Sequence, residues 1–329
     1  YKRQDNHGLA SKQVTRTFIK QIDSIKPDIV HLHNIHGYYL NYEILFDYLA
    51  QLDIPIVWTL HDCWAFTGHC AYYSYVGCNR WRTLCHDCPQ KKSYPSSWFA
   101  DRSEQNFRDK LHAFTSVRNM TLVPVSAWLA EEVRLSFLKD YPIQVIHNGI
   151  DTDVFSPKQI CKSNLGLKDK FMILGVASVW ETRKGLDDFI KLRKLLSDDY
   201  SIVLIGLDEK QIKQLPKGII GIRRTNSIQD LVAYYSVADA YFNPTWEDNF
   251  PTTNLESLSC GTPVITYHTG GSVEAVDERT GFVVEQGNIA EVANIVEFIK
   301  EMGKEHWTFV CRERARNLYD KKERYMEYL

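Results

Sequence analysis

Three carboxylates lie close to a helix start in the segment between Asn243 and Ile265, which reads NPTWEDNFPTTNLESLSCGTPVI. Asp248 is eight positions before Glu256, and Glu247 is nine positions before it. Carboxylates accept hydrogen bonds from paired sugar hydroxyls, and the unpaired N–H groups of a helix start favour phosphate. The segment therefore predicts a sugar-nucleotide site. In the alternative interpretation, the acids only stabilise the helix N-terminus, where negative charge is favoured.

The residues around these acids predict half of a β-α-β unit. Ala240–Asn243 is a short apolar strand, a loop rich in turn formers follows, and Thr252 or Thr253 is expected to cap a helix that ends at Gly261. The next strand is expected to start within 262–265. Ligands of such units bind beyond the carboxyl ends of the strands, so we expect the acids to face the ligand.

A basic pair, Arg183 and Lys184, follows a predicted buried strand at 171–178 and precedes Gly185. Two cations at the end of a strand can neutralise a pyrophosphate and the charge that grows on a departing diphosphate. The alternative is an exposed basic cap. The position of the pair directly after the strand favours anion binding.

Histidines mark the ends of two strands predicted earlier in the chain. His31 and His33 alternate along the first strand and share one face, while His61 ends the second and is followed by Asp62. An imidazole there can hydrogen-bond a sugar hydroxyl or move a proton near neutral pH. We interpret His31 as a core histidine and His61 as functional. Ser126, after a third strand, is explained by donor positioning or by helix capping.

Taken in order, these motifs resemble the retaining GT-B glycosyltransferases of family 4, also called glycosyltransferase group 1. The resemblance rests on the spaced acids with CGTPVI, on the basic pair, on NGID from Asn148 to Asp151, and on a TGG-x-x-E turn from Thr269 to Glu274. At 145–150 we expect a buried strand that Asn148-Gly149 breaks, with a turn of positive φ at a domain junction.

The resemblance implies two Rossmann-like, doubly wound parallel-sheet domains that face a cleft. The acceptor-side domain is expected at 1–149 with a Cys-rich insertion at about 62–98, the nucleotide-sugar domain at 150–305, and a helical segment that crosses back at 306–329. The first convincing strand comes only near Ile29. We therefore expect the first domain to lack its first strands and Gly-rich loop, as a fragment or as a naturally shortened enzyme.

The resemblance also implies roles for particular residues. The residues expected to take part in catalysis are His61, Asp248, Glu247, Lys184 and Arg183. The residues expected to bind the donor are Arg183, Lys184, Glu256, Asn249, Phe250, Pro251, Thr252, Thr253, Gly270 and Gly271. The residues expected on the acceptor side are His33, Asn34 and His36. The first acid of the family's motif is Asp248 by spacing or Glu247 by residue type, and this choice stays open.

The activity that the resemblance implies is transfer of a hexosyl group from a nucleoside-diphosphate sugar to a saccharide or polyprenyl-linked acceptor, with retention. The expected setting is bacterial polysaccharide biosynthesis in the cytoplasm, with peripheral contact at the inner face of the plasma membrane. No cofactor is expected to be needed for catalysis. The alternatives are a non-catalytic nucleotide-sugar sensor or scaffold, an inactive fragment, and a nucleotide-sugar epimerase of the same fold.

Four of the eight cysteines fall close together, with the spacing C-x7-C-x6-C-x2-C at Cys70, Cys78, Cys85 and Cys88. One Cys-x-x-Cys pair fits an edge of a tetrahedral zinc site, so a structural zinc is one interpretation. Reduced buried thiols and disulfides are the others. The remaining cysteines, at 63, 161, 260 and 311, are interpreted as isolated core residues.

Composition agrees with a two-domain α/β protein. The 329 residues are 44% hydrophobic, which is ample for two separate cores. The net charge of −2 gives no general attraction to nucleic acid, so no nucleic-acid partner is expected. No apolar run approaches the length of a membrane-spanning helix.

Overall fold

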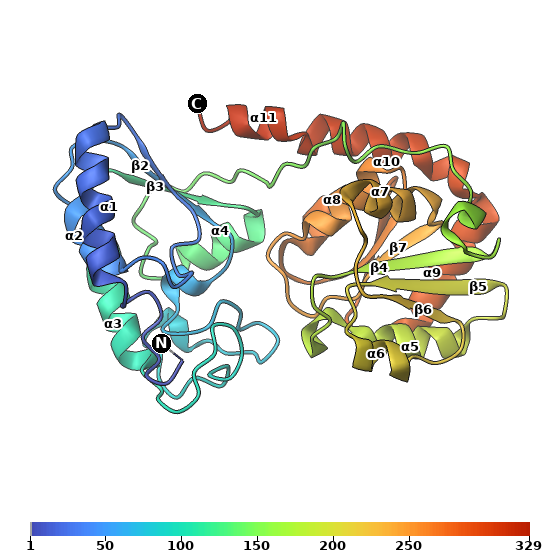
Figure 1. The fold of residues 1–329 in the computed structure, drawn as a ribbon, viewed down its shortest axis with the longest axis horizontal. Coiled ribbons are helices and arrows are strands. Elements are labelled where there is room, and N and C mark those ends of the chain that lie inside the picture. The colour runs from blue at the N-terminus through green and yellow to red at the C-terminus, as the bar shows by residue number, and fades with distance from the viewer. Residues whose placement is uncertain (1) are drawn as a thin grey trace. The chain divides into compact units, whose positions relative to one another are not determined.

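The computed structural model describes residues 2–329, which separate into two compact units. The first unit ends at Ile146, and the second is His147–Leu329. Each unit has a parallel sheet with helices on both sides (Figure 1). The predicted α/β class with two parallel sheets is confirmed.

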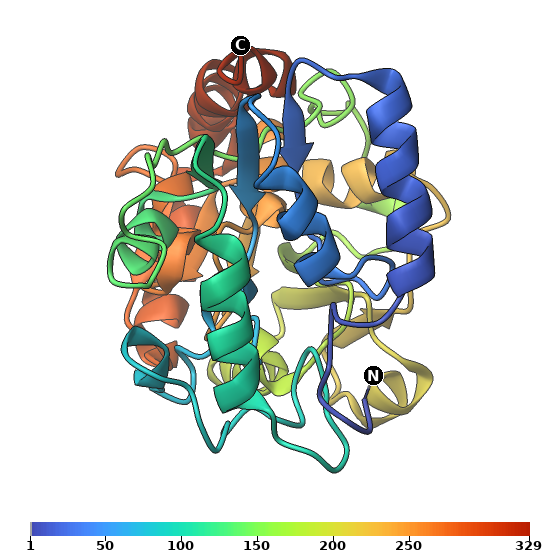
Figure 2. The ribbon, with the colours of Figure 1, turned by 90° about the vertical axis from the view of Figure 1, so that its left-hand side faces the viewer.

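The first unit holds a three-stranded sheet in the order β1-β2-β3, and all its strands are parallel. Its strands are β1 (Val30–Leu32), β2 (Ile56–Leu60) and β3 (Met120–Pro124), and its helices are α1 (Lys12–Ile25), α2 (Tyr42–Leu49), α3 (Ser103–Phe114) and α4 (Ala127–Arg134). Helices α1, α2 and α3 lie side by side on one face of this sheet, as Figure 2 shows, and α4 covers the other.

Aromatic side chains form the centre of the first unit. The rings of Phe46, Trp58 and Phe114 pack against one another with centroids 4.6 to 5.4 Å apart. Asn41 caps α2 by accepting a hydrogen bond from the backbone of Ile44 at 3.0 Å. Burying such rings removes a large apolar area from water, and this holds α2 and α3 against β2.

A long connection runs from β2 to α3 and contains only two short 3-10 turns, η1 (Trp64–Phe66) and η2 (Arg80–Arg82). It contains the predicted Cys-rich insertion. Although it has no strand, this loop is packed, because Trp64, Phe66 and Trp81 are buried. Aromatic side chains supply the apolar burial that orders a segment without regular structure.

The second unit holds a six-stranded parallel sheet in the order β6-β5-β4-β7-β8-β9. The strands are β4 (Phe171–Val176), β5 (Tyr200–Ile205), β6 (Ile219–Ile222), β7 (Ala240–Asn243), β8 (Val264–Tyr267) and β9 (Gly281–Val284). The helices are α5 (Leu186–Leu195), α6 (Glu209–Gln214), α7 (Ile228–Val237), α8 (Thr252–Ser259), α9 (Ile289–Met302), α10 (Lys304–Tyr319) and α11 (Lys321–Met326), with 3-10 turns η3 (Lys162–Leu165), η4 (Thr182–Lys184) and η5 (Gly270–Ala275).

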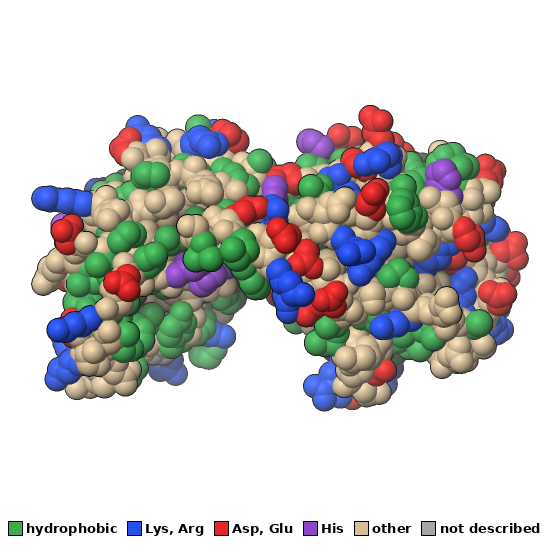
Figure 3. Space-filling model, turned by 90° about the horizontal axis from the view of Figure 1, so that it is seen from above, with side chains coloured by type: hydrophobic (Ala, Val, Ile, Leu, Met, Phe, Trp, Pro, Cys, Tyr) green, Lys and Arg blue, Asp and Glu red, His purple; other side chains and the backbone are tan. Residues whose placement is uncertain are grey.

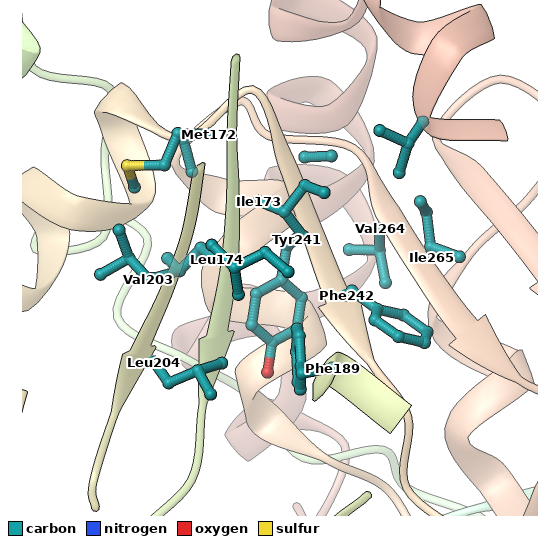
Figure 4. Close-up of a cluster of buried hydrophobic side chains, with 14 of the residues drawn as sticks. Met172, Ile173, Leu174, Phe189, Val203, Leu204, Tyr241, Phe242, Val264 and Ile265 are labelled. Carbon is teal, nitrogen blue, oxygen red and sulfur yellow. The ribbon is translucent and has the colours of Figure 1, made fainter. Parts of the chain in front are cut away.

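The strands of this sheet are continuous apolar runs because helices cover both faces. Figure 4 shows side chains of β4, β5, β7 and β8 meeting Phe189 of α5 in the core. All four residues of β7 are buried. The strand order reverses between β4 and β7, which pair at Ile173 and Ala240. This reversal creates a switch point, where the two crossover connections leave on opposite sides and open a crevice at the carboxyl ends.

The stretch 145–150 differs from its prediction. It is not a strand: one isolated bridge lies just before it, at Ile143, and another at its last residue, Ile150. Neither Asn148 nor Gly149 has positive φ. Gly149 is instead required by a close approach, since a Cβ there would lie 2.6 Å from the Cα of Lys321.

The C-terminal helices belong to the second unit. Trp307, Cys311 and Ala315 on α10 are buried in its core. The chain end also pairs with the start of the unit, because Ile150 bridges Asp320 and Asp151 binds Lys321 at 2.6 Å. The predicted crossing back of 306–329 onto the first domain stays a prediction. Within residues 2–329, every helix falls short of the length and apolarity that a membrane span requires.

Candidate functional site

Charged side chains meet at the switch point of the second unit. Lys184 follows β4 on the turn η4, Asp248 follows β7, and Lys184 Nζ lies 2.5 Å from Asp248 Oδ2. The two side chains are 23% and 14% exposed, so the pair is partly shielded but still reachable from solvent. The fold thus joins two predicted site residues that are 64 positions apart.

The backbone fixes the two loops against each other. Trp246 N–H donates to the Arg183 carbonyl at 2.8 Å, and the Arg183 guanidinium donates to the Glu247 carbonyl at 3.3 Å. Gly185 has φ 76°, and a Cβ there would lie 2.2 Å from the carbonyl oxygen of Pro244. Only glycine allows both that backbone conformation and that approach.

Glu256 lies on α8, the helix that follows the acidic loop, and is partly buried. Tyr235 donates to Glu256 Oε2 at 2.9 Å, and Thr252 contacts the other oxygen at 3.5 Å. Burial raises the pKa of Glu256, and the hydrogen bonds from Tyr235 and Thr252 oppose that rise. A partly buried carboxylate with two hydroxyl partners can accept further hydrogen bonds from a ligand's hydroxyl pair.

The helix start differs in detail from its prediction. Pro251, not a threonine, is the residue before α8, and no side chain caps the helix there. The Thr252 hydroxyl turns to Glu256 instead. Without a side-chain cap, the first N–H groups of α8 remain suited to a phosphate oxygen.

A buried polar network holds α8 in place. Asn243 at the end of β7 donates to Asn254 Oδ1 at 2.9 Å, and Asn254 donates to Ser272 of η5 at 3.1 Å. The turn η5 also contains the predicted glycines, of which Gly270 has φ 47°. The network joins three elements at the carboxyl edge of the sheet. The loop residues Asn249 and Phe250 are buried between them.

Two pairs near this site were not predicted. Trp246 donates from its indole to Asp188 Oδ2 at 2.7 Å, which ties the acidic loop to α5. His147 Nε2 lies 2.8 Å from Glu274 Oε2. The TGG-x-x-E turn pointed to Glu274, but nothing in the spacing pointed to His147 as its partner.

Histidines gather at the carboxyl ends of β1 and β2 in the first unit. His33 Nδ1 and His61 Nε2 are 3.0 Å apart, so one ring nitrogen donates to the other. Burial and the neighbouring His33 lower the pKa of His61, and burial lowers that of His33. His31 is exposed and bonded to Thr59 at 2.8 Å, so its interpretation as a core histidine is wrong.

A small hollow beside these histidines is lined by Asn34, His36 and Asp62, among others. His36 Nε2 lies 3.3 Å from Asp62 Oδ2, and its ring stacks on Trp64 at 4.9 Å. The sequence did not indicate this pairing of Asp62 with His36. Figure 3 shows histidine side chains among hydrophobic ones on the surface of the first unit.

All eight cysteines are free thiols, so the disulfide alternative does not hold. Cys70 and Cys88 approach closely, and the hydrogen bond from Cys70 lowers the pKa of Cys88 to about 7. Across residues 2–329, the metal-binding side chains that gather within 4.8 Å of one another are Asp5, His7 and His69 rather than the four clustered cysteines. The zinc assignment to those cysteines stays a prediction.

The predictions for the four cysteines outside the cluster and for Ser126 are confirmed in part. Cys63, Cys260 and Cys311 are buried, whereas Cys161 is exposed, so the core interpretation of Cys161 is wrong. Ser126 caps α4 by accepting from Leu129 N–H at 3.1 Å, which is the capping alternative.

Solved structures share this two-unit architecture. Sucrose-phosphate synthase from Thermosynechococcus elongatus superposes with a TM-score of 0.75 at 17% identity, covering 100% of this chain and 78% of that one. The Anabaena protein Alr3699/HepE in complex with UDP gives 0.70 at 16% identity, covering 96% and 81%. These likenesses define the fold as GT-B.

Sequence comparison gives the family. A family model described as "Glycosyl transferases group 1" matches residues 170–301, and one described as "Glycosyltransferase Family 4" matches residues 3–154. The chain belongs to the group 1, or family 4, glycosyltransferases of the GT-B fold, as the motifs predicted.

Two curated relatives illustrate the range of the family. The putative colanic acid biosynthesis glycosyl transferase WcaC of Escherichia coli is 24% identical over 280 residues, which are 82% of this chain and 67% of that protein. A Campylobacter jejuni enzyme, N,N'-diacetylbacillosaminyl-diphospho-undecaprenol alpha-1,3-N-acetylgalactosaminyltransferase, is 29% identical over 161 residues. That second match spans 45% of this chain and 42% of the relative's length.

Proposed function

We propose that this protein transfers a hexosyl group from a nucleoside-diphosphate sugar to a saccharide or polyprenyl-linked acceptor, with retention at the anomeric carbon. The observation that carries the proposal is the contact between Lys184 and Asp248 at the switch point, together with the partly buried Glu256 on the helix that follows Asp248. It combines a cation for a diphosphate with carboxylates for sugar hydroxyls in one crevice.

The second unit supplies the donor chemistry in this proposal. Lys184 and Arg183 neutralise the diphosphate as it departs, which stabilises the transition state more than the bound donor. Glu256 accepts hydrogen bonds from the ribose hydroxyls. Support for a nucleotide comes from the fold neighbour HepE, whose structure is in complex with UDP.

For the first acid of the motif we propose Asp248 rather than Glu247. Asp248 contacts Lys184 and remains 14% exposed at its side chain, whereas Glu247 is only 2% exposed. A hexose hydroxyl can therefore reach Asp248 by displacing its contact with the lysine. On the family resemblance, His61 also contacts the hexose, and His33, Asn34 and His36 serve the acceptor.

The setting proposed is synthesis of a cell-surface polysaccharide in the cytoplasm, at the inner face of the membrane. The names of two relatives support this setting. One name refers to colanic acid biosynthesis, and the other refers to a diphospho-undecaprenol acceptor. No cofactor is assigned to the transfer step.

Replacing Lys184 by alanine tests the proposal. Loss of one preorganised charge at a leaving group lowers kcat by about 10²- to 10³-fold. The measurement is release of nucleoside diphosphate from UDP-, GDP- and ADP-sugars, with and without polyprenyl-linked saccharide. Lys213→Ala, an exposed lysine of α6, is the matched control and should keep wild-type turnover.

Wild-type turnover by Lys184→Ala would contradict the assignment. Tight binding of a nucleotide sugar by the wild type, with neither transfer nor hydrolysis, would favour the alternative of a non-catalytic sensor.

A further inference from the structure

Three side chains of metal-binding type meet in the first unit, away from the histidines described above. They are Asp5, His7 and His69, and each offers a ligand atom within 4.8 Å of the other two. Their exposed fractions are 0%, 4% and 2%. The group joins the segment before α1 to the long loop after β2.

The hydrogen bonds of these side chains are incomplete. The Asp5 carboxylate accepts hydrogen bonds from Nδ1 of His69 at 2.5 Å and from the backbone N–H of Arg102 at 2.9 Å. The Nε2 of His69 and both ring nitrogens of His7 are buried without a hydrogen-bond partner. A buried nitrogen without a partner has lost its bond to water and gained none in return, which destabilises the fold. A satisfied core would not leave three of them around one carboxylate.

We propose that Asp5, His7 and His69 form a structural site for a divalent cation of the zinc class. Imidazole nitrogen and carboxylate oxygen are ordinary zinc ligands. Ligand atoms on a tetrahedral zinc lie roughly 3.4 Å apart, given Zn–N and Zn–O distances near 2.1 Å. Here the ligand atoms lie within 4.8 Å of one another, and Asp5 Oδ1 is 3.9 Å from His7 Nε2, so the side chains must draw together around a bound cation.

The site would fasten the start of the chain to the loop that carries η1. The backbone N–H groups of Trp98 and Ala100 already donate to the carbonyls of Lys2 and Arg3, at 2.5 and 3.3 Å. Cation binding adds a cross-link between residues 64 positions apart, His69 and Asp5. Because a metal binds the folded ligand set and not the open chain, its binding free energy stabilises the fold.

This site differs from the cysteine cluster predicted from the sequence, although His69 directly precedes Cys70. The two assignments can be separated by substitution. His7→Gln and His69→Gln remove proposed ligands, while Cys78→Ser and Cys85→Ser leave them intact.

The experiment loads purified full chain with Zn²⁺, dialyses it and measures the bound metal by mass spectrometry. We expect about one zinc per chain in the wild type and in both cysteine variants. Loss of a direct ligand should weaken zinc affinity by well over tenfold, because changes to residues that only hydrogen-bond a metal ligand already weaken it by about tenfold or more. Cobalt substitution should give no thiolate-to-metal charge-transfer band in the near ultraviolet.

A readout on the wild type alone covers the case in which a variant does not fold. Chelation should lower Tm, and added Zn²⁺ but not Mg²⁺ should restore it, because Mg²⁺ prefers oxygen ligands. The proposal is overturned if the wild type retains no zinc, or if His7→Gln keeps the metal and Cys78→Ser loses it.

Discussion

At the scale of single residues, Lys184 and Asp248 hold each other in place before any ligand arrives. Their contact of 2.5 Å is partly shielded, and such pairs add little net stability because desolvation offsets the attraction. The contact matters more for position. It fixes a flexible lysine near the place where we assign the diphosphate, so less conformational entropy is lost on binding.

Glu256 gives a prediction with a definite sign in pH. Its raised pKa means that protonation in the folded protein begins at a higher pH than for an ordinary glutamate. Only the ionised carboxylate accepts two hydrogen bonds freely, so nucleotide-sugar affinity should fall as pH drops toward that pKa. Titration calorimetry with UDP-glucose across this range measures the fall.

Glu256→Gln should remove that pH dependence and weaken binding by about 1.5–3 kcal/mol, the value of a charge-assisted hydrogen bond. This corresponds to roughly tenfold to hundredfold in Kd. Glu278→Gln, an exposed acid, is the control and should change neither. An unaltered pH profile in Glu256→Gln would assign the dependence to another group.

The sequence predicted the residues of the candidate site better than it predicted the contacts between them. The sequence contained Lys184, Asp248 and Glu256 as residue types at the right positions. Their partners lie far along the chain, as with Tyr235 and Glu256, and such pairs depend on strand order. Spacing along the sequence identifies neighbours within one helix or strand. It cannot identify contacts between residues that the strand order of the sheet brings together.

At the scale of elements, the turn η4 and the loop after β7 are held together by Gly185. Gly185→Ala would place a Cβ against the Pro244 carbonyl in addition to straining φ. We expect a loss of stability greater than that of Gly166→Ala by at least about 1 kcal/mol. We also expect weaker nucleotide-sugar binding, because both loops must shift.

Gly166 is a matched control because it has φ 69° with nothing within 4 Å of the added Cβ. It isolates the strain of positive φ from the clash. Urea unfolding of both variants measures the difference in free energy of unfolding. Equal losses of stability in the two variants would show that the contact with Pro244 does not contribute to the effect of Gly185→Ala.

Elements with strong patterns were predicted closely, such as β7, whose bounds at 240–243 match. Continuous apolar runs bounded by turn residues produce that success. The failure at 145–150 has a physical reason. Its apolar residues resemble a strand, but the backbone there finds partners only at isolated positions.

At the scale of the whole molecule, the two units have separate cores, so the second should fold by itself. Residues 147–329 expressed alone should unfold in one cooperative transition and bind a nucleotide sugar. Saturation at a hundredfold above Kd should raise the free energy of unfolding by about 2.7 kcal/mol. Calorimetric melting with and without UDP-glucose measures this. A broad transition without ligand response would show that the unit depends on the first.

The pairing of the chain end with residues 150–153 has a consequence during synthesis. The bridge from Ile150 to Asp320 and the contact from Asp151 to Lys321 join the beginning of the second unit to residues translated much later. At about 5–20 residues per second, translation leaves that beginning waiting on the order of ten to forty seconds. The first unit has its own core and is complete well before then. The second unit can close only after residues 320–321 have emerged from the ribosome, and until then the surface of α8 that α10 covers stays exposed.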